Sequence, residues 1–197
     1  MSFRLHAGTI GMSLLLGATA LLGGCAGTPP APTITHKMVV NERVTQPDTV
    51  SVRIENDPGV DVLPSTKQRV TEKIQARIDA RKLTNPAAQD PRTLEVVVHV
   101  TRYEKGNAFA RAMLAGLGQI HIDGTITLYH MPEHTVIEEF ALAKTFAWGG
   151  IYGAATTIET IEDTFADGIA QTVTGQQPPD TKAQEQSKPV AQAPKAH

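Results

Sequence analysis

The sequence of 197 residues contains a single cysteine, which excludes an internal disulfide. Positive charge is also scarce, because 18 Lys and Arg against 20 Asp and Glu leave a formal net charge of -2. That balance is too weak for a nucleic-acid-binding face, so we expect no nucleic-acid partner. After residue 24 only three serines remain, and none lies in a nucleophile elbow. The chain also lacks a Walker loop, a GxGxxG turn and an HExxH helix, so we expect neither enzyme activity nor a cofactor.

The only cysteine ends an apolar run. Residues 10–22 are apolar or small and follow a short polar start, which is the layout of an export signal. The run is shorter than the roughly 20 residues that span a bilayer. Its end, Leu-Gly-Gly-Cys, resembles the bacterial lipobox, in which a peptidase cuts before a cysteine that carries diacylglycerol. We expect a lipoprotein signal peptide over 1–24, cleavage between Gly24 and Cys25, and acylation of Cys25. The alternative is an ordinary secretory signal cut near Ala26.

The residue after the cysteine favours one membrane over the other. It is Ala26 and not aspartate, which by resemblance to the Gram-negative sorting rule favours the outer membrane. Two or three acyl chains hold a protein firmly on a bilayer, whereas one chain holds it only marginally. We therefore expect a lipid-anchored protein of the outer membrane whose folded domain faces the periplasm.

Composition divides the remaining chain into three parts. Residues 25–48 include Pro29, Pro30 and Pro32 and show little periodicity, so we expect the lipidated cysteine to be followed by a flexible tether. Residues 49–174 have the length and the apolar content of a single domain. Residues 175–197 are rich in Gln, Pro, Ala and Lys and lack aromatic residues, which predicts a disordered tail.

Periodicity within the domain predicts an α+β fold. Four stretches alternate apolar and polar residues and are expected to be strands: 49–56, 93–103, 119–129 and 135–148. Two stretches repeat apolar residues at helical spacing, one opening at Pro64 and one over 156–173. The order is β-α-β-β-β-α. We expect two layers, an antiparallel meander sheet with both helices on its apolar face.

Two glycine-rich segments interrupt this pattern, GNAFARAMLAGLGQ at 106–119 and WGGIYGAAT at 148–156. Their glycines are expected where the backbone bends or where a helix closely approaches the sheet. Their large apolar residues, on segments that we expect to be loops, suggest instead a contact surface. The candidate interaction residues are Phe109, Arg111, Met113, Leu114, Gly116, Gly118, Trp148, Gly149, Gly150, Tyr152 and Gly153.

The same segments carry a family resemblance. The stretches ARAMLAGLGQIHIDGTITLY and FALAKTFAWGGIYGAATTIETIEDTFADGIAQTV resemble bacterial envelope lipoproteins of a domain-of-unknown-function family, DUF4410. The resemblance covers about residues 50–173. It departs from the family pattern at YHMPEHT, where the family has an Asp-x-x-Thr-Gly type of turn. It implies the fold and an envelope location, and it implies no known catalysis. The matching positions are Arg111, Gly116, Gly118, Gly149, Gly150 and Gly153.

A metal site is the main competing interpretation. The weak candidates are His121, Asp123 and His134, with His130 and Glu133 in the same stretch. The pattern brings together only pairs of them, whereas a metal site needs three or four converging ligands. We therefore expect a non-enzymatic accessory lipoprotein that binds another envelope protein, or a second copy of itself, through the glycine-rich segments. The alternatives are a metal-dependent envelope hydrolase and a subunit of an oligomeric envelope or secretion assembly.

Overall fold

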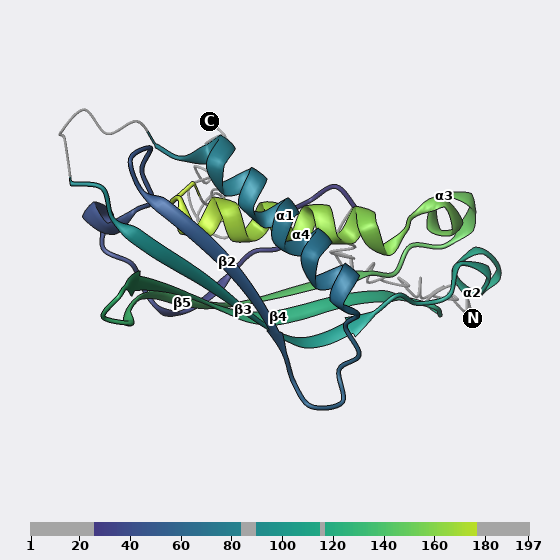
Figure 1. Cartoon of the computed structure of the whole chain (residues 1–197). Coiled ribbons are helices and arrows are strands. Elements are labelled where there is room, and N and C mark those ends of the chain that lie inside the picture. Colours follow the sequence, from purple (N-terminus) through teal and green to yellow (C-terminus); the bar gives the residue numbers. More distant parts are fainter. Residues whose placement is uncertain (1–25, 84–89, 115–116, 177–197) are drawn as a thin grey trace, which may run out of the picture.

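One sheet carries its two long helices on the same side (Figure 1). The computed structural model describes residues 26–83, 90–114 and 117–176. Helices α1 (Pro64–Arg81) and α4 (Ile158–Val173) lie over one face of the sheet. Two short helices, α2 (Ala108–Met113) and α3 (Gly150–Ala155), lie together at one end of the molecule. Among the described residues, no helix is both long enough and apolar enough to cross a membrane.

The sheet has five strands in the spatial order β1-β5-β4-β3-β2. Strands β3, β4 and β5 form the predicted antiparallel meander, and the α+β class is confirmed. Two features correct the prediction. Strand β2 pairs with β3 in parallel, because α1 returns the chain to the end where β2 began. A fifth strand, β1, pairs with β5, so the sheet is mixed. The strands are β1 (Thr33–His36), β2 (Thr49–Asn56), β3 (Thr93–Glu104), β4 (Ile120–Met131) and β5 (Thr135–Phe146).

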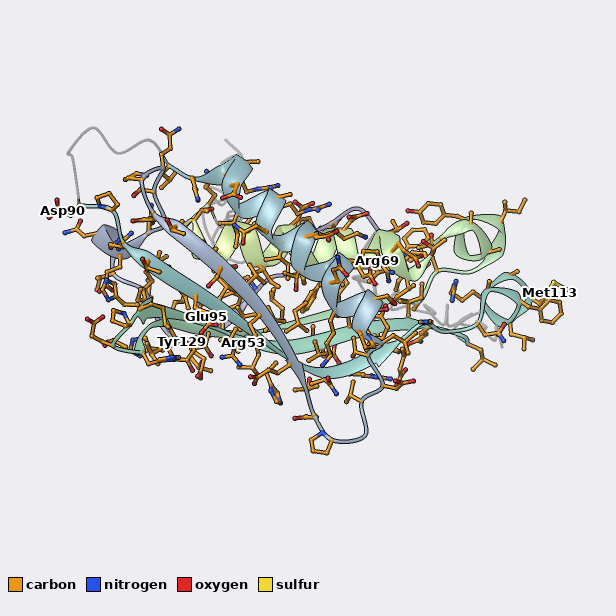
Figure 2. All side chains as sticks on the ribbon, in the orientation of Figure 1. Arg53, Arg69, Asp90, Glu95, Met113 and Tyr129 are labelled. Carbon is orange, nitrogen blue, oxygen red and sulfur yellow. The ribbon has the colours of Figure 1, made fainter. Side chains whose placement is uncertain are left out.

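Alternation along the central strands assigns one face to the core. Successive strand residues point to opposite faces, so every second residue can be apolar and buried. The opposite face is polar, and Figure 2 shows Arg53, Glu95 and Tyr129 on the side away from the helices. Arg53 and Glu95 form an ion pair there at 3.1 Å. The buried residues of β3 and β4 that face the helices are Leu94, Val96, Val98, Val100, Ile120, Ile122, Ile126 and Leu128.

A β-bulge changes this alternation near the end of β3. Val100 pairs with Gly124, but Arg102 pairs with Asp123, so Thr101 is an extra residue without a partner on β4. The extra residue reverses which positions face the helices. Tyr103 consequently pairs with Ile122 on the helix side of the sheet.

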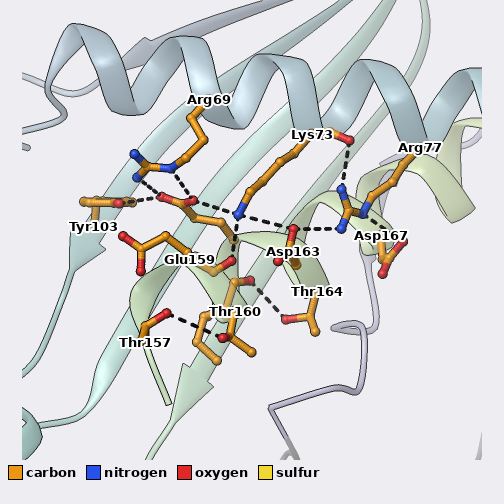
Figure 3. A network of polar contacts seen from close by, with 12 residues as sticks. Arg69, Lys73, Arg77, Tyr103, Thr157, Glu159, Thr160, Asp163, Thr164 and Asp167 are labelled. Atoms are coloured by element: carbon orange, nitrogen blue, oxygen red, sulfur yellow. Dashed lines mark hydrogen bonds and ion pairs between the residues drawn. The ribbon is translucent and has the colours of Figure 1, made fainter. Parts of the chain in front are cut away.

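Charged side chains fix how the two long helices lie against each other (Figure 3). Helix α1 carries four basic residues at four-residue spacing, which places them on one stripe facing the acidic residues of α4. The pairs to Asp163 and Asp167 are partly exposed and contribute little stability individually, so they mainly set the register of the two helices. The N–O contacts are Arg69–Glu162 at 2.7 Å, Lys73–Glu162 at 3.1 Å, Lys73–Asp163 at 3.2 Å, Arg77–Asp163 at 2.8 Å, Arg77–Asp167 at 3.1 Å and Arg81–Asp167 at 2.8 Å.

The segment that we expected to be a flexible tether, 25–48, packs on the domain over its described residues 26–48. Strand β1 pairs with β5, and the Lys144 side chain donates to the carbonyl oxygen of Thr28. Apolar residues of the segment join the core, including Ala26 and Val44. Prolines favour an extended backbone, and here that extended chain lies along the sheet instead of in solvent.

The end of this segment is held by a buried carboxylate. Asp48 accepts hydrogen bonds from the Thr45 backbone N–H at 2.8 Å and from the Arg92 guanidinium at 2.6 Å. Burial raises the pKa of Asp48, but the hydrogen bonds from Arg92 and Thr45 outweigh it and hold the pKa below its ordinary value. The expected signal peptide, 1–24, and nearly all of the expected tail, 175–197, lie outside the described residues.

Candidate functional site

Two short helices form the end of the molecule. The glycine-rich segments, which we expected to be loops, contain α2 (Ala108–Met113) and α3 (Gly150–Ala155), and the two helices contact each other. The side chain of Asn107 caps α2 by accepting a hydrogen bond from the backbone N–H of Ala110 at 2.9 Å. The structure therefore brings together two segments that are separated by strands β4 and β5 in the sequence.

Large apolar side chains cover the solvent side of this pair, and we call this surface the apolar tip. Ile151 is 91% exposed and Phe109 is 73% exposed, which leaves their apolar surfaces almost wholly in water. Figure 2 shows Met113 at the extremity of the molecule. Five members were predicted from the sequence, whereas Leu117 and Ile151 were missed although they lie in the same two segments. The apolar tip consists of Phe109, Met113, Leu114, Leu117, Trp148, Ile151 and Tyr152.

Arg111 corrects the predicted surface, because its side chain is only 3% exposed. Its guanidinium points inward and donates to three backbone carbonyls: Gly153 at 2.8 Å, Gly118 at 2.7 Å and Thr156 at 2.8 Å. One side chain on α2 thus binds the loop before β4 and the C-terminal part of α3. Burial lowers the pKa of Arg111, and an arginine stays charged in spite of such a shift. Arg111 holds the tip together and does not form its surface.

The glycines of the segments serve this close packing. A Cβ atom on Gly153, which is buried, would lie 2.1 Å from the carbonyl oxygen of Trp148. Gly118 has a φ of +69°, and a Cβ atom there would lie 2.4 Å from the carbonyl oxygen of Asn107. Both positions therefore require glycine for structural reasons. The predicted surface residue Gly116 lies outside the described residues, while Gly149 and Gly150 are exposed at the start of α3.

The apolar tip presents no formal charge to solvent. In 106–119 and 147–157 the only Lys, Arg, Asp or Glu is Arg111, whose charge is directed into the structure. Exposed and uncharged apolar surface of this kind is typical of a binding site.

Aromatic contacts connect the tip to the core. The ring of Tyr152 meets Trp148 edge-on, with centroids 6.1 Å apart, and meets Phe146 at 5.9 Å. Phe146 is fully buried at the end of β5. Tip side chains are therefore supported by a fixed side chain of the core, which orders the surface that they present.

The predicted metal ligands do not converge. His121 and Asp123 lie on β4, where His121 Nδ1 is 3.0 Å from Thr145 Oγ1. His134 lies in the turn beyond β4, with its ring against Tyr129. Since a strand rises about 3.3 Å per residue, more than about 20 Å of chain separates His134 from Asp123. Within the described residues no group of three or more His, Cys, Asp or Glu side chains could hold a metal ion.

The most buried carboxylate is saturated with donors. Glu162 is fully buried on α4, and its two oxygens accept hydrogen bonds from Arg69, Lys73 and Tyr103 at 2.7 to 3.1 Å. Burial raises the pKa of Glu162, but these hydrogen bonds outweigh it and leave the pKa below its ordinary value. The adjoining cavity of about 10 Å³ holds at most one water molecule. A carboxylate with this set of partners is poorly suited to take up a proton from a substrate.

The predicted lipid attachment and cleavage residues, Gly24 and Cys25, lie outside the described residues and stay predictions. The next residue in the chain, Ala26, is buried. The packed domain therefore begins one residue after the expected acylated cysteine.

Residues 57–150 match a family described as Domain of unknown function (DUF4410), which confirms the resemblance found in the sequence. No curated protein matches the chain. Two structures of the PelC dodecamer from Paraburkholderia phytofirmans are similar in fold, at 11% and 12% identity and a TM-score of 0.49, covering 73% of this chain and 97% of that chain.

Two further solved structures are more distant. A protein from Xanthomonas campestris has 14% identity and a TM-score of 0.38, and covers 76% of this chain and 91% of its own. A minor lipoprotein from Acinetobacter baumannii has 15% identity and a TM-score of 0.31, and covers 64% of this chain and 90% of its own. At these TM-scores the similarities carry no conclusion about what this chain binds.

Proposed function

The chain carries a match to DUF4410 over residues 57–150, and we propose that it is a lipid-anchored, non-enzymatic protein of the bacterial envelope that binds through its apolar tip. The observation that carries the proposal is the tip itself, which exposes seven large apolar side chains and no formal charge. The lipobox-like end of the apolar run supports the anchor, and Ala26 after the cysteine supports a location at the outer membrane, with the domain on the periplasmic side.

The arrangement of side chains in the domain suits binding better than catalysis. Its central sheet and paired long helices form a rigid scaffold, and Arg111 fixes the two tip segments to each other. The buried carboxylate of Glu162 already accepts hydrogen bonds from three side chains. Within the described residues, the histidines on β4 and in the turn after it do not join a group that could hold a metal ion. Rigid presentation of apolar side chains is what a binding surface needs.

Labelling of cells with a palmitate analogue tests the anchor. Wild type should incorporate the label and fractionate with the outer membrane. Cys25→Ser should keep the longer precursor mass and incorporate no label, because the serine hydroxyl is not the thiol that the transferase modifies. Wild type without label, or a serine variant that is processed and sorted normally, would contradict the proposed anchor.

Partner capture tests the binding role. A photocrosslinking residue introduced at Phe109 should yield adducts in intact cells, to lipid or to protein, whereas the same residue at Val39 should not. Val39 is the matched position because it is also an exposed apolar residue but lies outside the tip. Equal labelling at the two positions would contradict a binding role for the tip.

A further inference from the structure

The path of the N-terminal segment leads toward the apolar tip. Strand β1 runs antiparallel to β5, with Ile34 opposite Phe140, so each step back along the segment moves forward along β5. Further back along the segment, the carbonyl oxygen of Thr28 accepts a hydrogen bond from the side chain of Lys144, near the end of β5. Two residues after Lys144, β5 ends at Phe146 and the chain enters the tip. Ala26 therefore lies toward the end of the molecule that carries the tip.

The packing of Ala26 restricts where an acyl anchor can hold the domain. Ala26 is only 3% exposed and belongs to the core cluster. Cys25 is its direct neighbour in the chain, so a lipid on Cys25 is separated from a fixed core residue by one peptide unit. Since one residue spans less than about 4 Å, the acyl chains reach the bilayer only when this end of the domain is next to it.

The chemistry of the apolar tip suits the boundary between water and lipid. Tryptophan and tyrosine are enriched at that boundary, and the tip contains both, as Trp148 and Tyr152. Helices α2 and α3 have six residues each, far too few to cross a bilayer but enough to lie in its surface layer. The one charge of these segments, on Arg111, is compensated by three carbonyls within the structure, so no charge has to enter the lipid.

We infer that the occupant of the apolar tip is the surface of the same bilayer that holds the lipid on Cys25. This inference deepens the proposed function and depends on its anchor. Anchor and tip act as two contacts of one rigid body: the acyl chains supply the attachment, and the apolar side chains enter the headgroup layer and set the orientation of the domain. A lipid surface accepts the tip without ion-pair partners, and the tip segments direct no formal charge to solvent that a protein partner could pair with.

Trp148 reports directly on this contact, because it is the only tryptophan in the chain. The lipoprotein is purified from membranes in detergent and reconstituted into vesicles of phosphatidylethanolamine and phosphatidylglycerol, with and without brominated phosphatidylcholine. We expect a blue-shifted emission, protection from aqueous iodide, and a loss of at least half of the emission with lipids brominated near the headgroup. Lipids brominated deep in the chains should quench less.

A matched pair of variants isolates the tip. The double variant Phe109→Ser/Ile151→Ser replaces two exposed tip side chains, and should restore quenching by iodide and lose most of the quenching by brominated lipid. Val39→Ser replaces an exposed apolar residue beside the 3-10 turn Val40–Glu42 and should behave as wild type. Far-ultraviolet circular dichroism of each variant checks that the domain is folded.

The outcomes separate the two proposals. A palmitate-labelled protein whose Trp148 stays open to iodide and is not quenched by brominated lipid would overturn the inference and leave the anchor intact. Protection from both quenchers would also overturn it and would assign the tip to a second copy or another protein, which crosslinking at Phe109 distinguishes. An unlabelled protein would overturn the anchor itself, whatever Trp148 reports.

Discussion

Tyr103 donates its hydroxyl hydrogen to Glu162 Oε1 at 2.7 Å, and it reaches that carboxylate only because Thr101 is an extra residue in β3. Without the bulge, Tyr103 would point to the polar face of the sheet. Burial and the hydrogen bond to Glu162 raise the pKa of the Tyr103 hydroxyl, so it stays protonated as a donor. The bulge thus connects the central sheet to the charged ladder between α1 and α4 (Figure 3).

Tyr103→Phe is expected to lower the free energy of unfolding by about 1.5–3 kcal/mol, the usual contribution of a hydrogen bond to a charged group. The ring keeps its packing, so the loss reports on the hydroxyl. Urea unfolding followed by circular dichroism measures it. Tyr129→Phe, on the polar face of the sheet, is the control and should change stability by less than about 0.5 kcal/mol. Equal effects of the two variants would contradict the role given to the Tyr103 hydroxyl.

Glu162→Gln should destabilise the domain by about 2 kcal/mol or more, because a neutral amide would replace the buried carboxylate that accepts hydrogen bonds from Arg69 and Lys73. Thermal unfolding of the purified chain measures the loss. Glu159→Gln changes the same residue type one turn earlier on α4, where the side chain is exposed, and should have a small effect. A Glu162 variant as stable as wild type would mean that the charged ladder contributes nothing at its buried end.

Arg111→Ala is expected to loosen the tip before it affects the core. The buried carbonyls of Gly153 and Thr156 would lose the guanidinium as donor, while that of Gly118 would keep the Asn107 N–H, and the total cost should be about 2–4 kcal/mol. Hydrogen exchange followed by mass spectrometry should show faster exchange in 106–119 and 150–157, with the central strands unchanged. Arg102→Ala removes an exposed arginine that pairs with Glu104 and should not alter exchange in the tip. Hydrogen exchange in the tip of the Arg111 variant as slow as in wild type would rule out that Arg111 holds the two tip segments together.

Stability should fall as the pH rises, because of Glu138. This side chain is buried on the inner face of β5, and burial raises its pKa from 4.5 to about 7, although the Met38 backbone N–H and Arg43 act in the opposite direction. The folded state therefore holds the proton more tightly than the unfolded state. The stabilisation of the folded state by this proton is complete below pH 4.5. It is lost as the pH rises through 7, which lowers the free energy of unfolding by about 3 kcal/mol in all.

Glu138→Gln should remove this part of the pH dependence and should be more stable than wild type at pH 8. Urea unfolding from pH 5 to pH 8 measures the difference, with Glu139→Gln on the opposite face of β5 as the control. A wild-type profile that stays level over this range, together with an unchanged profile for Glu138→Gln, would contradict the assignment of the proton to Glu138.

The strands and long helices were predictable because each has one buried face. Val96 and Val98 on β3, like Ile126 and Leu128 on β4, follow the two-residue period of a half-buried strand. The bulge at Thr101 was not predictable, because an extra residue leaves local composition unchanged and is defined only by pairing with β4. Strand β1 was missed for a related reason: its partner, β5, lies about a hundred residues further along the chain.

The surface of the candidate site was predictable only in part. Phe109 and Trp148 were predicted to be exposed because they are large apolar residues in glycine-rich segments, and both are exposed in the structure. Arg111 was expected at the surface as part of the glycine-rich segment, yet its partners are backbone carbonyls, which every residue possesses and no sequence pattern distinguishes. Ile151 gave no signal, because outward orientation depends on how α3 contacts α2.

The position of β1 has a consequence for the order of folding. Thr35 hydrogen-bonds to Glu139, 104 residues away, so the first strand of the chain pairs with the last one. Contacts of such high sequence separation slow folding, because a large loop must close before they form. Until β5 has arrived, the N-terminal segment has no place on the sheet and the adjoining cysteine is not held by the domain. For the acylation that we propose at Cys25, late docking of β1 would leave a period in which the modifying enzymes can reach the cysteine before the sheet is complete.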